Sequence, residues 1–265
     1  MADSFFVPNG DDGQWLATAH TTGPWDARSQ HGGPPSALLG RAMQECERRP
    51  DMMIARFTCE ILRPIPVGEI SVAARVVRSG RSVELLEASV SAGGRDVARA
   101  SAWRVLRTDA EAVPSRQRAP EGPPDDYPEM RRPRSWGDGL LAAMEWRVIR
   151  GGWHGAGPTA IWGRMRYPLI PDEEPSPLER ALIIADSGNG VSWELDINRW
   201  HFINPELTVH LHREPVGEWI CLDAETAISP GGVGLATSVL SDTTGPIGAG
   251  AQSLLIARRP NGPGS

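Results

Sequence analysis

Alternating apolar and polar residues mark a run of strands in each half of the chain. Residues 59–107 alternate with a period of two between turn signals at Ser79-Gly80 and Gly93-Gly94, and residues 208–258 repeat this pattern. Period-two alternation is typical of strands with one buried face. We therefore predict three or four long antiparallel strands in each half.

One helix is predicted ahead of each run of strands. In the first, Pro34 and Pro35 occupy positions where a helix N-terminus tolerates proline, and apolar residues follow at helical spacing up to Cys46. In the second, Ser176 and Glu179 form a capping-box pattern, and we expect the helix to end at Gly188. A lone helix on one face of an antiparallel sheet predicts an α+β class.

A short repeat indicates that the two halves arose by internal duplication. Pro66–Glu69 recurs as Pro215–Glu218, an offset of 149, and the hairpin spacing and the closing apolar strand follow. The same offset aligns Trp103 with Gln252. We predict two antiparallel sheets, each wrapped on a long helix.

A segment rich in proline and charge separates the halves. Residues 109–135 contain almost no large aliphatic side chains and cannot bury a face, so we expect a linker. The predicted units are therefore residues 1–108 and 136–265.

Composition excludes several classes of function. The 265 residues carry a net charge of −6, which argues against sequence-independent binding of nucleic acid. All 27 basic residues are arginine, so no lysine is present for a Schiff base, a pyridoxal phosphate anchor or a P-loop. No apolar run reaches the roughly 18 residues of a membrane span. We expect no nucleic acid and no membrane as partners.

The cysteines and histidines give no metal or redox motif. The three cysteines lie far apart without a Cys-x-x-Cys pair, which is typical of a reducing compartment. His210 and His212 share one strand face, but no third ligand is evident. The N-terminus resembles no signal peptide. We expect a cytoplasmic protein without metal or cofactor.

Short motifs along nearly the whole chain resemble the acyl-CoA thioesterase II-like family. They are His31-Gly32-Gly33, Arg63-Pro64, Ala185-Asp186, Leu207–Arg213, Glu218-Trp219 and Ala251-Gln252, in the family's order. The resemblance implies a tandem hotdog fold, called a double hotdog. It also implies hydrolysis of an acyl-CoA to free acid and CoA, and assembly into a homodimer or higher oligomer.

The resemblance also implies site residues. An Asp, a Thr and a Gln of the family's second hotdog hold the hydrolytic water, and Asp186 and Gln252 match the Asp and the Gln. The Thr position corresponds to Asn204, with Thr208 as the alternative. Related enzymes polarise the thioester carbonyl at the turn that matches Gly32-Gly33.

The chemistry of thioester hydrolysis suits these residue types. It needs a positioned water, a base and donors for the developing oxyanion. Asp186 supplies a carboxylate, and Gly32-Gly33 supplies backbone N–H groups at a helix N-terminus. We expect His31 to shape this loop and not to act as the base.

Two other functions stay open on the same fold. A hydratase of acyl thioesters would need a histidine near the helical acid, and none follows Asp186 closely in sequence. An acyl-CoA-binding or lipid-binding protein that lost catalysis is the second alternative, which the absence of the Thr favours.

Overall fold

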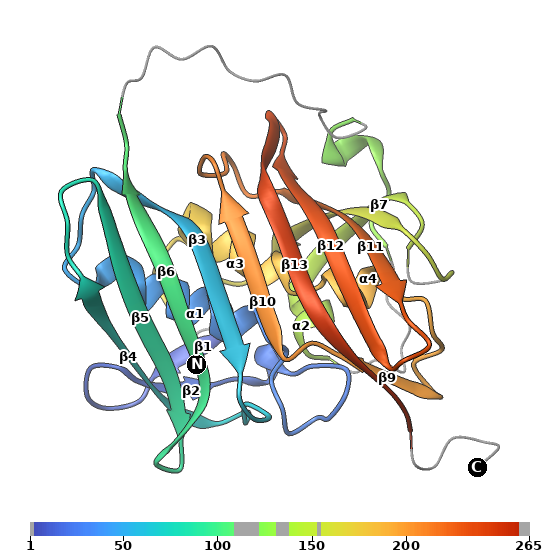
Figure 1. Ribbon diagram of the computed structural model, residues 1–265, viewed down its shortest axis with the longest axis horizontal. Coiled ribbons are helices and arrows are strands. Elements are labelled where there is room, and N and C mark those ends of the chain that lie inside the picture. The colour runs from blue at the N-terminus through green and yellow to red at the C-terminus, as the bar shows by residue number, and fades with distance from the viewer. Residues whose placement is uncertain (1–2, 109–121, 131–137, 153–154, 260–265) are drawn as a thin grey trace.

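A single antiparallel sheet forms the frame of the molecule. The computed structural model describes residues 3–108, 122–130, 138–152 and 155–259. Within them, thirteen strands join in the order β1-β2-β4-β5-β6-β3-β10-β13-β12-β11-β8-β7, with β9 paired to β13 (Figure 1). The strands are β1 Phe6–Pro8, β2 Gln14–Ala17, β3 Met52–Ile61, β4 Glu69–Arg78, β5 Val83–Ala92, β6 Arg95–Leu106, β7 Met144–Arg150, β8 Thr159–Met165, β9 Trp200–Ile203, β10 Glu206–Leu211, β11 Ile220–Ile228, β12 Val233–Asp242 and β13 Gly245–Arg258.

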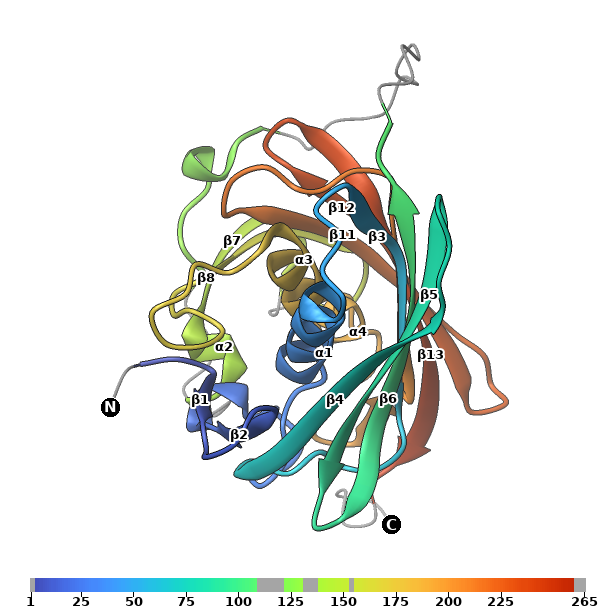
Figure 2. The same ribbon diagram turned by 90° about the vertical axis from the view of Figure 1, so that its left-hand side faces the viewer.

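The helices α1 Gly33–Glu45, α3 Pro177–Ala185 and α4 Gly188–Val191 lie inside the curl of this sheet (Figure 2). The other helical elements are the α-helix α2 Leu140–Ala143 and the 3-10 turns η1 Ala19–Thr21 and η2 Pro124–Asp126. The N-terminal end of the sheet is attached to the segment after β8, where the Phe6 N–H of β1 donates to the carbonyl of Leu169. In the described residues, no helix combines the length and apolar character needed to cross a membrane.

The strand order shows the duplication directly. From β1 to β3 it reads 1-2-4-5-6-3, and from β7 to β10 the corresponding strands read in the same relative order. Both halves also carry a bulge at the same place, next to Val90 in the first and Leu240 in the second. The tandem hotdog prediction is confirmed.

The register corrects the predicted offset by one residue. Val72 pairs with Val90 and Leu222 pairs with Leu240, so equivalent positions differ by 150 residues (222 against 72, and 240 against 90). A shift of one residue turns a strand position to the other face of the sheet. The equivalent of Gln252 is therefore Ala102, which is buried, and not Trp103.

The two halves share one sheet, where the sequence predicted two separate ones. β3 pairs antiparallel with β10, and Thr58 faces Thr208 at the centre of this seam. Pairing these strands satisfies backbone groups that would otherwise be exposed along two sheet edges. The seam is the axis of the pseudo-twofold symmetry.

Helices α1 and α3 pack closely against each other through glycines. A Cβ added to Gly33 would lie 2.4 Å from the carbonyl oxygen of Ile183, and one added to Gly40 would lie 2.6 Å from Leu182. The N-terminus of α1 is thereby brought against the C-terminus of α3. This packing brings residues from both halves of the chain into contact where α1 meets α3.

The second helix is shorter than predicted. Ser176 caps it with the expected capping box, but the helix ends at Ala185 and Asp186 is its C-cap. Gly188 begins α4 and does not end α3. The break between α3 and α4 falls at Asp186, the residue that the sequence analysis predicts to supply the catalytic carboxylate.

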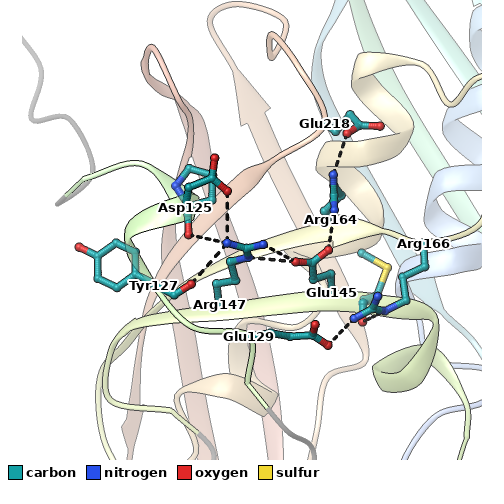
Figure 3. A network of polar contacts seen from close by, with 10 residues as sticks. Asp125, Tyr127, Glu129, Glu145, Arg147, Arg164, Arg166 and Glu218 are labelled. Atoms are coloured by element: carbon teal, nitrogen blue, oxygen red, sulfur yellow. Dashed lines mark hydrogen bonds and ion pairs between the residues drawn. The ribbon is translucent and has the colours of Figure 1, made fainter.

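Part of the predicted linker packs on the second half. Residues 109–121 and 131–135 lie outside the described residues, and the domain boundaries stay a prediction. Arg147 of β7 donates to Asp125 and to the carbonyls of Pro124 and Tyr127, and it shares the buried Glu145 with Arg164 (Figure 3). These bonds attach residues 124–127 to the β7–β8 edge.

The hydrophobic core has two parts. The larger part fills the space between the sheet and helices α1 and α3, and it contains residues from both halves. A smaller cluster around Phe202, Ala236, Leu254 and Ile256 lies near β9 and the loop before it. The cavity described next lies beside this second cluster.

Candidate active site

A cavity of about 660 Å³ opens between the two halves of the molecule. The first half contributes residues 24–26, 29–32, 61 and 63–65. The second contributes residues 186–187, 189–191, 193, 196–198 and 201–205, with Leu141 and Leu255. Of the predicted site residues, His31, Gly32, Asp186 and Asn204 line it.

Asp186 is held on both carboxylate oxygens. Its side chain is 3% exposed, and its Oδ1 accepts from Asn204 Nδ2 at 2.8 Å and from Gln252 Nε2 at 3.1 Å. Its Oδ2 lies 2.9 Å from His31 Nδ1. A buried carboxylate needs such donors to offset its desolvation.

Gln252 is buried beside the interruption between α3 and α4 and bridges it. Its Nε2 donates to the backbone carbonyl of Asp186 at 3.0 Å as well as to Oδ1, and its Oε1 accepts from the N–H of Asn189 at 3.0 Å. The three bonds fix the orientation of Asp186. They engage both ends of the Gln252 amide with the protein.

His31 Nδ1 lies between two possible partners. The Gly33 N–H is 3.1 Å from it and Asp186 Oδ2 is 2.9 Å from it. A ring nitrogen offers either a lone pair or an N–H, so it serves only one of the two at a time. If Asp186 is ionised, Nδ1 carries the hydrogen that bonds to the carboxylate.

Gly32 allows this contact between the halves. A Cβ at Gly32 would lie 2.7 Å from Asp186 Oδ2, so only glycine leaves room for the carboxylate. Helix α1 continues with Pro34 and Pro35, which have no N–H. Gly32 and Gly33 therefore provide the first backbone donors of this helix.

The structure separates the two alternatives for the third polar residue. Asn204 contacts Asp186 directly and also donates to the carbonyl of Glu206 at 3.2 Å. Thr208 contacts Thr58 and Glu206 at the seam, on a strand whose neighbouring residues Leu207 and Val209 are buried in the core. Its hydroxyl therefore lies on the outer face, away from Asp186.

Sequence reasoning missed much of the cavity wall. Trp25, Gln30, Trp193, His201 and Phe202 line it, and none of them lies in a recognisable motif. Arg63 and Arg213, which lie at similar places in the two halves, also differ in their surroundings. Arg213 pairs with the buried Asp242, whereas Arg63 lines the cavity.

His210 and His212 form no part of the site. In the described part of the chain, no group of three or more His, Cys, Asp or Glu side chains is placed to hold a metal ion. The site is thus described by Asp186 and its three partners His31, Asn204 and Gln252.

This protein therefore consists of two hotdog units with a buried carboxylate, Asp186, where they meet. The model of the acyl-CoA thioesterase N-terminal domain matches residues 21–105, and that of the C-terminal domain matches residues 124–256. The chain belongs to the acyl-CoA thioesterase family and is a thioester hydrolase.

Solved structures show the same fold at low sequence identity. A hot dog fold protein of unknown function from Alicyclobacillus acidocaldarius is 16% identical, with a TM-score of 0.75 over 94% of this chain and 95% of its own. An acyl-CoA thioesterase II from Mycobacterium marinum is 15% identical, with a TM-score of 0.66 over 96% and 95%. No curated protein matches the sequence.

Proposed function

We propose that this chain hydrolyses a fatty or related acyl-CoA to the free acid and CoA, with Asp186 activating the water. The observation that carries the proposal is the position of Asp186. It lies on the wall of the cavity and is held by His31, Asn204 and Gln252. A preorganised carboxylate beside the substrate suits general base catalysis.

Asp186 takes the proton of the attacking water in this mechanism. The Nδ2 group of Asn204 donates to Asp186 and to the carbonyl of Glu206. The amide oxygen of Asn204 has no partner within the described residues, so this oxygen can accept a hydrogen bond from the same water. The water attacks the thioester carbonyl carbon, the C–S bond breaks, and CoA leaves as the thiol after protonation. Gln252 acts here as a positioning residue, because both ends of its amide bond to the protein.

The glycine pair polarises the carbonyl. With ionised Asp186 bonded to His31 Nδ1–H, the Gly33 N–H cannot use that nitrogen as an acceptor. Backbone N–H groups at the N-terminus of α1 stabilise the negative charge that develops on the carbonyl oxygen. His31 therefore couples the carboxylate to the carbonyl-binding turn.

The His31–Asp186 contact also favours one alternative. No histidine follows Asp186 closely along the chain, but the first half brings His31 Nδ1 to 2.9 Å from Asp186 Oδ2. A histidine and a carboxylate can hydrate an enoyl thioester. Thiol release and hydration of crotonyl-CoA should therefore be measured on the same preparation.

The decisive variant is Asp186→Asn. We expect thiol release from acyl-CoA to fall about 10²–10⁴-fold, because the amide cannot take a proton. The protein should stay folded, since Asn keeps an oxygen for Asn204 and Gln252 and its amide can donate to His31 in the other tautomer.

The matched control is Asp223→Asn, the same exchange on the outer face of β11, where Asp223 pairs with Arg150. It should keep parental thiol release. Unchanged hydrolysis by Asp186→Asn would refute the assignment of the base. A parent that binds acyl-CoA but releases no thiol would instead support the binding-protein alternative.

A further inference from the structure

Aromatic side chains form the wall of the cavity away from Asp186. We call Trp25, Trp193, His201 and Phe202 the aromatic lobe; all four line the cavity. Trp25 meets Phe202 edge-on, with ring centroids 4.9 Å apart, and lies 5.9 Å from the ring of His201. Such edge and tilted arrangements are those in which aromatic rings attract one another.

The aromatic lobe is connected to the reacting groups by short stretches of chain. Trp25 lies on the same loop as His31, and Phe202 is two residues before Asn204. Asn189, which Gln252 holds, donates its side chain to the carbonyl of Phe202 at 2.9 Å. An acyl group whose thioester lies at Asp186 would therefore extend toward the aromatic lobe.

Polar atoms without partners lie among these rings. Within the described residues, Trp193 Nε1 and His201 Nδ1 are buried and bond to nothing. Burial and the nearby charge of Arg259 lower the pKa of His201, so its ring is neutral at neutral pH and Nδ1 can donate or accept according to the tautomer. Buried polar groups are normally satisfied, so each of these two indicates a missing partner.

We propose that the acyl group of the substrate carries a ring with a hydrogen-bonding substituent, such as an arylalkanoyl group with a ring hydroxyl. The ring would contact Trp25 and Phe202, and the substituent would bond to Trp193 and His201. This inference rests on the proposed function and names the substrate class of the same site.

A straight saturated chain fits the aromatic lobe less well. It would leave Trp193 Nε1 and His201 Nδ1, which are already buried, without a partner. A site built to bond a polar group rejects analogues that lack it, because its own groups are then left unpaired. The preference should therefore appear in kcat/KM.

The first experiment compares substrates on the parental protein. Thiol release is measured with phenylacetyl-CoA, 4-hydroxyphenylacetyl-CoA and octanoyl-CoA, which have the same number of acyl carbons. We expect kcat/KM for 4-hydroxyphenylacetyl-CoA to exceed that for octanoyl-CoA by about tenfold or more. Phenylacetyl-CoA should lie between them.

The second experiment removes one donor. Trp193→Phe keeps an aromatic ring but loses Nε1–H, and should reduce the preference for 4-hydroxyphenylacetyl-CoA over phenylacetyl-CoA about five- to tenfold. The control is Trp200→Phe, because Trp200 belongs to the same segment, stacks under Arg258 and does not line the cavity. It should leave the preference unchanged.

The outcomes separate this inference from the proposed function. Octanoyl-CoA cleaved as well as or better than both aryl substrates would overturn the ring preference and leave hydrolysis intact. An unchanged preference in Trp193→Phe would overturn the role of its donor. Absence of thiol release from every acyl-CoA would refute the proposed function itself.

Discussion

Asp186 is placed at the boundary of the two halves by its neighbours more than by its helix. A carboxylate at the C-terminus of α3 meets the negative end of the helix dipole, which is unfavourable. Three side-chain donors, Asn204, Gln252 and His31, offset this cost. The cost and its compensation at one residue are typical of a functional site.

Substitution of Gly32 tests whether catalysis needs the close approach of this glycine to Asp186. Gly32→Ala would place a Cβ 2.7 Å from Asp186 Oδ2 and push the carboxylate away from His31. Displacement of a catalytic group by about 1 Å can cost about 10²-fold in rate, so we expect a loss of that order in kcat. The measurement is thiol release at saturating acyl-CoA.

Gly190→Ala is the matched control for that exchange. Gly190 also lines the cavity, but an added Cβ would meet no described atom within 4 Å. The control should retain most of the activity. Equal activity of both variants would show that the Gly32–Asp186 approach is unimportant.

Gln252 gives a second prediction at the residue scale. Gln252→Ala removes three hydrogen bonds that orient Asp186 and the start of α4. We expect kcat to fall about 10–10²-fold, less than for Asp186→Asn, since no proton acceptor is lost. The thermal midpoint should also fall, because the Asn189 N–H is left buried without a partner. A variant with parental kcat and stability would contradict the positioning role.

The individual site residues could be predicted better than their contacts. Gly-Gly before a helix and an acid in an apolar stripe are local signals, and they led to Gly32 and Asp186. The contact of His31 with Asp186 joins residues 155 positions apart (186 against 31), so no local pattern contains it. The lobe residues Trp193 and His201 have no local signal either.

At the scale of elements, the N-terminus of α3 contains an unusual acid. Glu179 completes the capping box with Ser176, yet it is almost fully buried, and this burial raises its pKa to about 7. Arg41 of α1 opposes the shift and Glu173 adds to it. The helix cap is therefore also a titrating group.

The sign of the resulting pH dependence follows from proton binding. Between its unfolded pKa near 4.5 and the folded value of about 7, folded Glu179 binds more protons than the unfolded chain, so stability falls as pH rises. Glu179→Gln removes this term and keeps a capping side chain. From about pH 5 to pH 8 it should gain about 1–3 kcal/mol relative to the parent.

Denaturant unfolding at several pH values measures this difference. The control is Glu194→Gln, since Glu194 is exposed, and its difference from the parent should stay flat with pH. A flat difference for Glu179→Gln as well would show that Glu179 titrates normally in the folded protein.

Elements and their order were largely predictable, but joins between them were not. Proline, capping and turn residues are local signals, because each is recognised from a few neighbouring positions of the chain. They predict the helix starts and the hairpins. The pairing of β3 with β10 depends on distant backbone edges, so two sheets were expected where one forms. The interruption of α3 depends on Gln252, 66 positions after Asp186 (252 against 186).

At the scale of the whole molecule, the backbone fold follows the pseudo-twofold symmetry, but the side chains of the candidate site do not. The position equivalent to Gln252 is Ala102, which has no amide to hold an acid. When α1 and α3 are aligned at their first residues, Ala42 takes the place of Asp186. Because these two positions of the first half hold small residues, we expect one working site per chain.

The outer face of the sheet also differs between the halves. In the first half it carries ion pairs such as Arg75 with Glu87. The second half also carries an ion pair on this face, Arg150 with Asp223. On β12, however, Leu235 and Val239 stay 46% and 48% exposed, with Val233 beside them. A row of exposed apolar side chains along one strand is unlike a face that meets only water.

The last prediction is that two copies of the chain pair through this apolar face of β12. A twofold dimer buries the same patch on both partners, so the double variant Leu235→Glu, Val239→Glu should bring like charges together and give a monomer. Light scattering at micromolar concentration should show at least a dimer for the parent. Val77→Glu, on an exposed apolar residue of the first half, should leave the assembly unchanged. A monomeric parent would refute the assembly, and a dimeric double variant would place the interface elsewhere.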